Sequence, residues 1–300
     1  MFKGVLVNIW LIVLVISISQ SVIGEQANCF RIVAEDSLEN ALKGGKAAVV
    51  DVGEGVLFEL LPGQKKYFPG PEGSLQRLFV YYKGEKVKEL PESFYMGYTR
   101  IEAESMTYWM IEEYTGGLHC CTVFHFFAKE NVSHPLRYIG ATGGSIKLPE
   151  KASGFICQDG QVYFEDTDIR FLYFHTSFGH SQLFLPRFYH ITPSSLKITN
   201  SKFERKYLED VRILDNDIKD ILVSRTAKPR ALITEEKDNA NFTDELGQLL
   251  VKRTILYLYA RKDNKAWQSL KSDVKKYYDT TKGLEQIKKE ILKILKESPY

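Results

Sequence analysis

The chain has 300 residues, of which 44% are hydrophobic and 26% are charged, and its formal net charge is +2. This balance is typical of a folded globular protein and excludes a chain that is disordered throughout. A net charge so close to zero also gives no reason to expect a nucleic acid as partner. The length allows one large domain or two modest ones.

The first 24 residues have the pattern of a secretory signal peptide. Lys3 provides the positive start, the run "VLVNIWLIVLVISI" is the apolar core, and the segment ends at the small residue Gly24. We expect cleavage before Glu25. An uncleaved membrane anchor is the alternative, but the apolar run is shorter than the ~20 residues that a spanning helix needs. The sequence therefore predicts an exported protein, periplasmic or secreted.

Residues 25–200 are expected to form a β-rich domain. From about residue 47 to about residue 191, short apolar and aromatic runs such as "RLFVYYKGEKVKEL" and "MTYWMIEEYTGG" are broken by Gly, Pro and Asp. This spacing is typical of antiparallel sheets in a sandwich or in part of a propeller. A weak repeat with an offset of 62 residues aligns residues 107–127 with 169–189, each read as an aromatic strand, a glycine turn and a second aromatic strand.

Residues 201–300 are expected to be helical, which makes the predicted fold class α+β. Good helix formers dominate, and apolar residues recur three and four positions apart. Near the end of the chain one apolar stripe is formed by Leu284, Ile287, Ile291, Ile294 and Leu295. Residues 252–297 contain 13 Lys or Arg against 6 Asp or Glu. They form either a solvated helical face or a surface for an acidic envelope polymer or another protein.

The segment "YTGGLHCCTVFHFF", residues 114–127, gathers two histidines and two adjacent cysteines after a Gly-Gly pair. A two-residue turn at Gly116 and Gly117 would place Tyr114 opposite His119. Because side chains alternate along a strand, one face would then carry Tyr108, Met110, Glu112, Tyr114, His119, Cys121, Val123 and His125.

Cys120 and Cys121 would point to opposite faces of that strand, so neither a shared metal ion nor a bond between them is favoured. Four cysteines in an oxidising compartment favour disulfides. We therefore expect Cys29 and Cys157 each to bond one member of the Cys120–Cys121 pair, which would anchor the hairpin on both sides.

Two further interpretations use the same face of the hairpin. A hydrolase would use Cys121 as nucleophile, His119 as its base and Glu112 as the orienting acid. A zinc or copper site would use His119, Cys121 and Glu112, with His125 or a histidine of the second hairpin (His175, His180 or His190) as a further ligand. The spacing matches no established catalytic or zinc motif, so no catalytic residue, metal or other cofactor is assigned.

Elsewhere the chemistry-bearing patterns are sparse. The acidic residues between Asp159 and Asp168 either form a surface turn or offer oxygen ligands to calcium, although the spacing of a dedicated calcium loop is absent. The glycines of "ATGGS", residues 141–145, lack the following helix pattern that a phosphate site needs.

The hairpin "IEEYTGGLHCCTVFHFF" resembles one found in largely uncharacterised exported bacterial proteins, some of which are similar to propeller-type repeat proteins. In this chain "FEDTDIRFLYFHTSFGHS" lacks the Asp-Gly-Asp-Gly turn of those repeats. The helical end "YLYARKDNKAWQSLKSD" and the terminal "ILKESPY" are similar to the tails of some such proteins. The resemblance implies export and a sheet-rich fold, and it implies no activity. The sequence thus favours a non-catalytic binding or envelope-interaction protein, with the hydrolase and the metal-binding protein as alternatives.

Overall fold

The protein is described here by a computed structural model, which covers ten stretches of the chain. These are residues 29–38, 41, 46–63, 75–115, 122–130, 134–144, 154–176, 181–226, 244–278 and 283–296.

The described strands form three antiparallel sheets that we name by their place in the molecule. The outer sheet contains β2 (Ala48–Asp51), β3 (Val56–Pro62), β4 (Gln76–Tyr82) and β5 (Glu85–Glu89). The central sheet, in the order β1-β6-β7-β8-β9, contains β1 (Arg31–Ser37), β6 (Phe94–Ala103), β7 (Met106–Tyr114), β8 (Thr122–Glu130) and β9 (Arg137–Ala141). The helix-side sheet contains β10 (Phe155–Gln158), β11 (Gln161–Asp168), β12 (Leu185–Ile191) and β13 (Leu196–Ile198).

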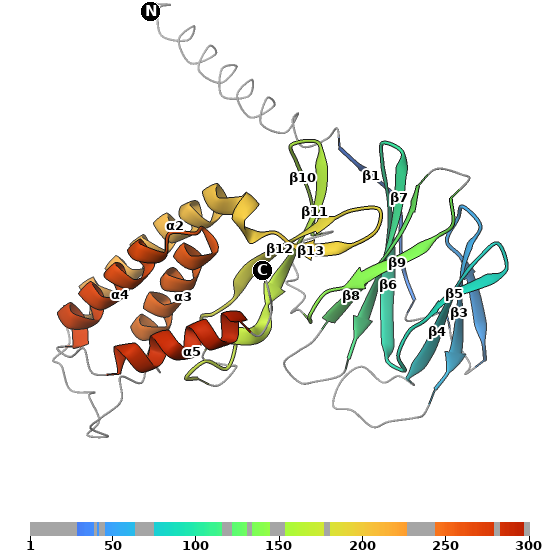
Figure 1. Ribbon diagram of the computed structural model, residues 1–300. Helices are drawn as coiled ribbons and strands as arrows, with labels where there is room; N and C mark the ends of the chain where they lie inside the picture. Colours follow the sequence, from blue (N-terminus) through green and yellow to red (C-terminus); the bar gives the residue numbers. More distant parts are fainter. Residues whose placement is uncertain are drawn as a thin grey trace, which may run out of the picture.

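The three sheets stack face to face, with the helices beyond the last of them (Figure 1). Alternation along each strand explains this, because a strand with apolar residues on both faces must be covered on both sides. In β7, Trp109 and Ile111 pack toward the outer sheet, whereas Tyr108 and Met110 pack toward the helix-side sheet. The central sheet is therefore the middle of the β-rich part.

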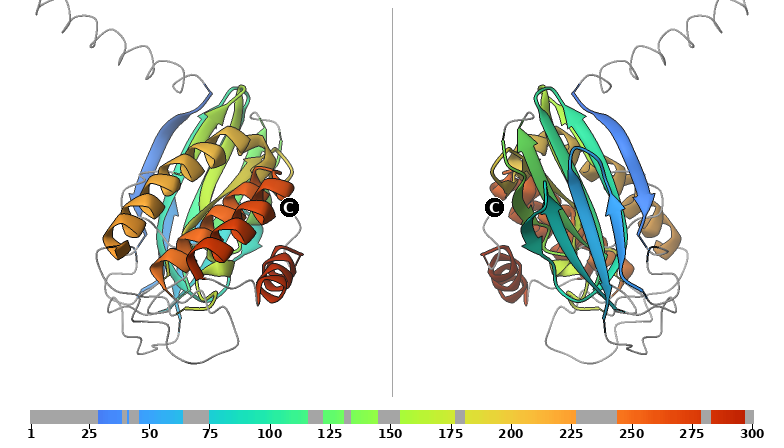
Figure 2. Two further views of the ribbon diagram at one scale, coloured as in Figure 1. Left: turned by 90° about the vertical axis from the view of Figure 1, so that its left-hand side faces the viewer. Right: turned by 90° about the vertical axis from the view of Figure 1, so that its right-hand side faces the viewer.

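Four described helices form the last layer: α2 (Glu204–Thr226), α3 (Glu245–Tyr259), α4 (Asp263–Tyr278) and α5 (Leu284–Lys296). Their apolar faces share one core with Tyr163, Leu185 and Phe188 of the helix-side sheet. The predicted stripe of α5 is confirmed, since Leu284, Ile287, Ile291 and Leu295 are buried and Ile294 packs against them. α5 lies apart from α2, α3 and α4 and runs in a different direction (Figure 2). Within the described chain, each helix is too short or too polar to span a bilayer.

The order of the elements confirms the predicted α+β fold, with sheets first and helices last. The aligned repeat is correct for its second strand only, because β8 and β12 are each the third strand of a four-stranded meander. The first strand expected after residue 169 is wrong. Residues 169–171 form a short 3-10 helix, and the Asp168 side chain accepts a hydrogen bond from the Arg170 backbone N–H at its start. An Asp in this position favours a helical turn over continued extension.

Several strand connections meet at one end of the sheets, which we call the loop end. In a meander of antiparallel strands, alternate strands end at the same edge of the sheet. The ends of β7 and β9, the second and fourth strands of the β6–β9 meander, therefore lie at the same end of the central sheet. Thr142, after β9, accordingly donates its backbone N–H to the carbonyl of Phe124, near the start of β8. The backbone N–H of Gly143 donates to the hydroxyl of Tyr189 in β12, at 3.3 Å. The start of β8 and residues 142–143 after β9 thus lie together, and Gly143 also reaches β12.

Candidate functional site

The β7–β8 hairpin, which carries the predicted site, has a different register from the one expected. Tyr114 pairs with Thr122 and not with His119, so residues 115–121 connect the strands in place of a two-residue turn. The register differs by three residues. Because an odd shift exchanges the two faces of a strand, the predicted set of residues on one face is wrong.

Glu112 and His125 therefore lie on opposite faces of the central sheet. Glu112 pairs with Phe124 and is 9% exposed, whereas His125 pairs with Ile111. The other predicted residues, His119, Cys120 and Cys121, lie outside the described residues. The grouping of Cys121, His119 and Glu112 thus stays a prediction, for the hydrolase and for the metal site alike. Only the use of His125 together with Glu112 in one metal site is contradicted, because the two side chains lie on opposite faces.

His125 instead belongs to a buried polar cluster between the central and outer sheets. Its Nε2 lies 2.5 Å from Oε2 of Glu113, and its Nδ1 lies 3.2 Å from the hydroxyl of Tyr138. Both side chains of the His125–Glu113 pair are less than a tenth exposed. Burial and the neighbouring Glu113 carboxylate raise the pKa of Tyr138. With both ring nitrogens engaged, His125 joins two strands of the hairpin to β9.

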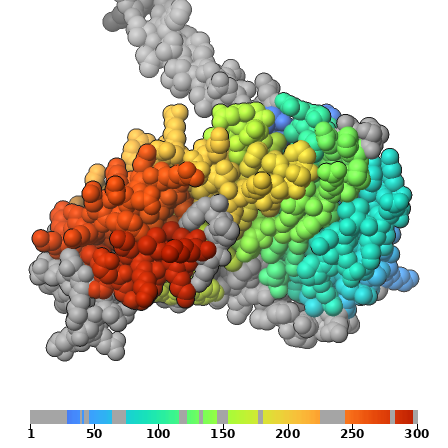
Figure 3. Space-filling view, viewed as in Figure 1, coloured from blue at the N-terminus to red at the C-terminus, as the bar shows by residue number. Residues whose placement is uncertain are grey.

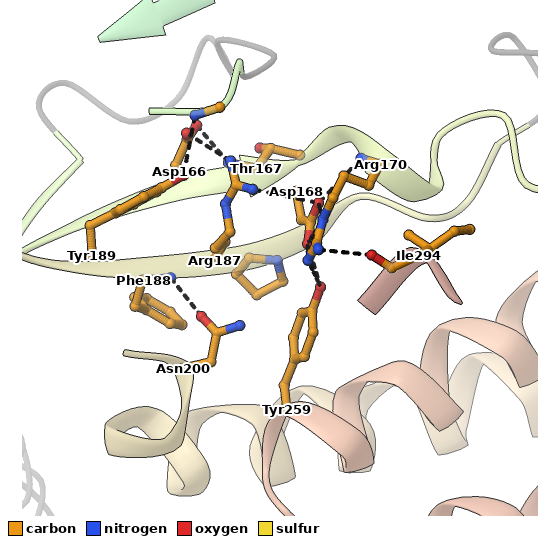
Figure 4. A network of polar contacts seen from close by, with 12 residues as sticks. Asp166, Thr167, Asp168, Arg170, Arg187, Phe188, Tyr189, Asn200, Tyr259 and Ile294 are labelled. Carbon is orange, nitrogen blue, oxygen red and sulfur yellow. Dashed lines mark hydrogen bonds and ion pairs between the residues drawn. The ribbon is translucent and has the colours of Figure 1, made fainter. Parts of the chain in front are cut away.

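A second polar cluster lies at the loop end of the helix-side sheet and extends from Gly143, after β9, to Tyr259 of α3 (Figure 4). We call it the Asp168 cluster; it consists of Asp166, Asp168, Arg170, Arg187 and Tyr259. Asp168 is fully buried. It accepts a hydrogen bond of 2.8 Å from Nε of Arg170 and another from the hydroxyl of Tyr259. Arg187 lies between the two carboxylates, with Nη1 at 3.8 Å from Asp168 and Nη2 at 3.7 Å from Asp166.

The electrostatics of the Asp168 cluster keep Asp168 ionised. Burial alone would raise its pKa, but the hydrogen bond from Arg170 and the charge of Arg187 outweigh burial and lower it below the ordinary 3.8. Two carboxylates face two guanidinium groups, so the buried charges are balanced. A carboxylate held in this way serves as a permanent acceptor and is poorly suited to take up protons in a reaction cycle.

Arg187 is 3% exposed, and its Nε and Nη2 have no hydrogen-bond partner within the described structure. Its guanidinium lies 5.1 Å from the centre of the Tyr189 ring. A Cβ placed on Gly143 would lie 3.4 Å from Nη2, so the backbone of the β9–β10 connection passes close over the guanidinium. Glycine at this position permits that approach.

The Asp168 cluster also reaches α5. Nη1 of Arg170 donates a hydrogen bond of 3.1 Å to the backbone carbonyl of Ile294. Nearby, Nε2 of His175 lies 2.6 Å from Glu290. Burial would raise the pKa of Glu290, but hydrogen bonds from His175 and Gln286 lower it. These contacts fix the C-terminal helix to the end of β11.

The calcium and surface-turn interpretations of residues 159–168 are both replaced by this arrangement. Only Asp159 and Gly160 form the turn, and residues 161–168 are strand β11 with two buried aspartates. Within the described residues, no group of three or more His, Cys, Asp and Glu side chains is placed to hold a metal ion. The pair Asp166 and Asp168 is the available signal in the sequence, since residues two apart share a face of a strand.

Cys29 and Cys157 are free thiols in the structure, and both belong to the core between the central and helix-side sheets. Their predicted bonds to Cys120 and Cys121 stay a prediction, because those two partners are not among the described residues.

The chain was compared with protein-family models, with curated proteins and with solved structures, and it matches none of them.

Proposed function

We propose that the chain is an exported, non-catalytic protein that binds a polyanionic envelope polymer through the outer face of α4 and α5. We call this the lysine face. It contains the exposed side chains Lys265, Lys271, Lys275, Lys276, Lys289, Lys293 and Lys296. The arrangement of these lysines is the observation that carries the proposal.

The lysines are placed outward by the packing of their helices. In α4 the buried residues Ala266, Leu270 and Val274 repeat every four positions and face the core. At 100° per residue, Lys271 and Lys275 point away from that stripe. In α5, Lys289 and Lys293 lie opposite Ile287 and Ile291 in the same way. The helices, orange and red in Figure 3, lie at the end of the molecule away from the outer sheet.

Three other basic residues of the 252–297 segment are engaged by acidic residues of the helical layer. Arg253 forms ion pairs with Asp215 and Asp273, and Lys262 lies 2.6 Å from Glu204. Burial lowers the pKa of Lys252, which lies near two aspartates of α2. The basic residues of this segment therefore fall into two groups. Some are paired with acidic residues, and most of the exposed lysines of the segment lie on α4 and α5.

The acidic residues of these two helices do little to offset the lysines. Asp273 is bound to Arg253, and Glu290 is bound to His175. Asp263 and Glu285 remain at the surface, near the start of each helix. Separate surface charges are screened over about 10 Å at 0.1 M salt, so a polymer with closely spaced anions fits such a face better than a small anion.

Export is the second part of the proposal and rests on residues 1–24, which have the signal-peptide pattern. In that location the available polyanions are envelope polymers with phosphate or carboxylate groups.

The test is the binding of the full mature chain to dextran sulfate, with uncharged dextran as the control ligand. The variant Lys271→Glu, Lys275→Glu, Lys289→Glu reverses three charges of the lysine face. We expect it to lose at least about tenfold in affinity, and we expect wild-type binding to weaken from 0.1 to 0.5 M salt.

The matched control is Arg205→Glu, Arg212→Glu, Lys219→Glu, which makes the same charge change at exposed positions of α2. We expect this control to keep most of the wild-type affinity. Equal losses in the two triple variants would show that only net charge matters, and no binding by wild type would refute the proposal.

A further inference from the structure

Cys29 and Cys157 come from distant parts of the sequence and meet at one edge of the sheet stack. Cys29 lies two residues before β1, the edge strand of the central sheet, and Cys157 lies in β10, the edge strand of the helix-side sheet. β1 and β10 are neighbours in the ribbon diagrams (Figures 1 and 2). The neighbouring Cys157 side chain helps to raise the pKa of the Cys29 thiol, as expected for two thiols that lie close together.

The residues around the two thiols also indicate that Cys29 and Cys157 lie close together. The Phe30 and Phe155 rings have centroids 5.9 Å apart, which brings the two backbone segments together next to the cysteines. Cys157 pairs with Val162, so its side chain points to the face of β10 that packs on the central sheet. Cys29 is buried in the same core and is 6% exposed.

This edge lies at the opposite end of the strands from the loop end. Arg31 pairs with Glu102, beside the turn between β6 and β7, and Glu104 in that turn acts on the Cys29 thiol. Residues 115–121 follow Tyr114, at the far end of β7. Eight residue steps of strand span roughly 26 Å, whereas bonded cysteines have Cα atoms less than about 7 Å apart. A bond between Cys29 and Cys121 would have to bridge most of that length.

We propose that Cys29 and Cys157 form a disulfide bond with each other in the exported protein, which covalently fastens the N-terminal segment of the central sheet to the helix-side sheet. This replaces the double anchor that the sequence suggested, and it leaves Cys120 and Cys121 outside the bond. The inference does not depend on polyanion binding.

The reaction is a thiol–disulfide exchange with a small or protein disulfide as oxidant. Cys157 is the more accessible thiol; as thiolate it attacks the oxidant, forms a mixed disulfide and releases one thiol of the oxidant. Cys29 then loses its proton and attacks the Cys157 sulfur, which forms the protein disulfide and releases the second thiol. Two electrons pass from the cysteines to the oxidant. Burial and the neighbouring Cys157 side chain raise the pKa of Cys29 to about 12, so this second step is expected to be the slower one.

Tryptic digestion can distinguish the alternatives, because the cysteines fall into three different peptides. Cys29 lies in the peptide that ends at Arg31, Cys157 in residues 152–170, and Cys120 with Cys121 in residues 101–129. The experiment treats the reduced full chain with oxidised glutathione, blocks remaining thiols, digests without reductant and identifies linked peptides by mass spectrometry.

We expect a link between the Cys29 and Cys157 peptides, and we expect the same link in the control variant Cys120→Ser, Cys121→Ser. A link from the 101–129 peptide to either of the others would overturn the inference. Recovery of Cys157 as a lasting glutathione adduct with Cys29 blocked as a free thiol would overturn it as well.

Discussion

The replacement Asp168→Asn tests whether the Asp168 cluster holds the helix-side sheet to the helices. The variant keeps the size of the side chain and removes its charge. Asp168 is fully buried, and its carboxylate receives hydrogen bonds from Arg170 and Tyr259 while Arg187 lies 3.8 Å away. Without the charge, two guanidinium groups in the interior lose their shared counter-ion.

Breaking a buried ion pair by removing one partner typically costs about 3–5 kcal/mol. We expect the free energy of unfolding to fall by about this amount in denaturant titrations. At about 2 °C per kcal/mol for a chain of this size, the melting temperature should fall by about 6–10 °C. The control Asp220→Asn, at an exposed position of α2, should change the free energy of unfolding by less than about 0.5 kcal/mol.

The pH dependence gives an independent check on the same variant. Because the pKa of Asp168 is lowered in the folded state, its contribution is fully present above the ordinary pKa of 3.8 and is lost as the pH falls through the folded-state pKa. The stability difference between wild type and Asp168→Asn should therefore be constant above about pH 5 and shrink below it. Equal stabilities at pH 7, or a difference that does not shrink in acid, would refute the reasoning.

Two further sets of substitutions, at a pair of glycines and at the His125–Glu113 pair, test other parts of the fold by denaturant unfolding. Gly154 and Gly160 both have positive φ angles, of +64° and +70°, but a Cβ on Gly154 would lie 2.7 Å from Cε2 of Phe164, while one on Gly160 would meet nothing within 4 Å. We expect Gly160→Ala to cost about 1 kcal/mol and Gly154→Ala about 2–4 kcal/mol, and equal costs would contradict the packing around β10. His125→Phe leaves Glu113 buried without its imidazole partner and should cost about 3 kcal/mol, part of which the added change Glu113→Leu should restore. A double variant no more stable than His125→Phe would show that the pair is not coupled.

The fold class could be predicted because it depends on local periodicity. Alternating apolar residues indicate strands up to about residue 191, and the three- and four-residue spacing of Leu284, Ile287, Ile291 and Leu295 indicates the buried face of α5. The stacking order of the three sheets could not be predicted in the same way. A strand such as β7 is apolar on both faces, so its sequence does not say which neighbour covers which face.

The predicted hairpin register is wrong because it treats the Gly-Gly pair as the whole turn. The observed register places Trp109 opposite Phe127, and both side chains are fully buried toward the outer sheet. Burial of large aromatic side chains decided the register, and a connection of seven residues accommodates it. The aromatic residues are evident in the sequence, but the sequence does not show directly how many residues the connection between β7 and β8 contains.

The Asp168 cluster was missed for a related reason. Asp168 and Arg170 are neighbours in the sequence, but Arg187 lies on the next strand and Tyr259 on α3, so only the tertiary fold unites them. Read alone, the acidic run of β11 indicates a turn or a cation site, since buried aspartates are rare without partners. The tertiary partners change this interpretation. The aspartate charges that suggested a calcium ligand are balanced by Arg170 and Arg187.

The two ends of the sheet stack therefore carry different kinds of contact between layers. At the loop end, the Asp168 cluster joins the helix-side sheet to α3 and α5 through hydrogen bonds and ion pairs. At the opposite end, Cys29 and Cys157 join the central sheet to the helix-side sheet. If the proposed disulfide forms, acid should weaken the first junction and leave the second intact, whereas a reductant should open only the second. Protection of β11 amides against hydrogen exchange, measured in acid and separately with a reductant, would report on the two junctions independently.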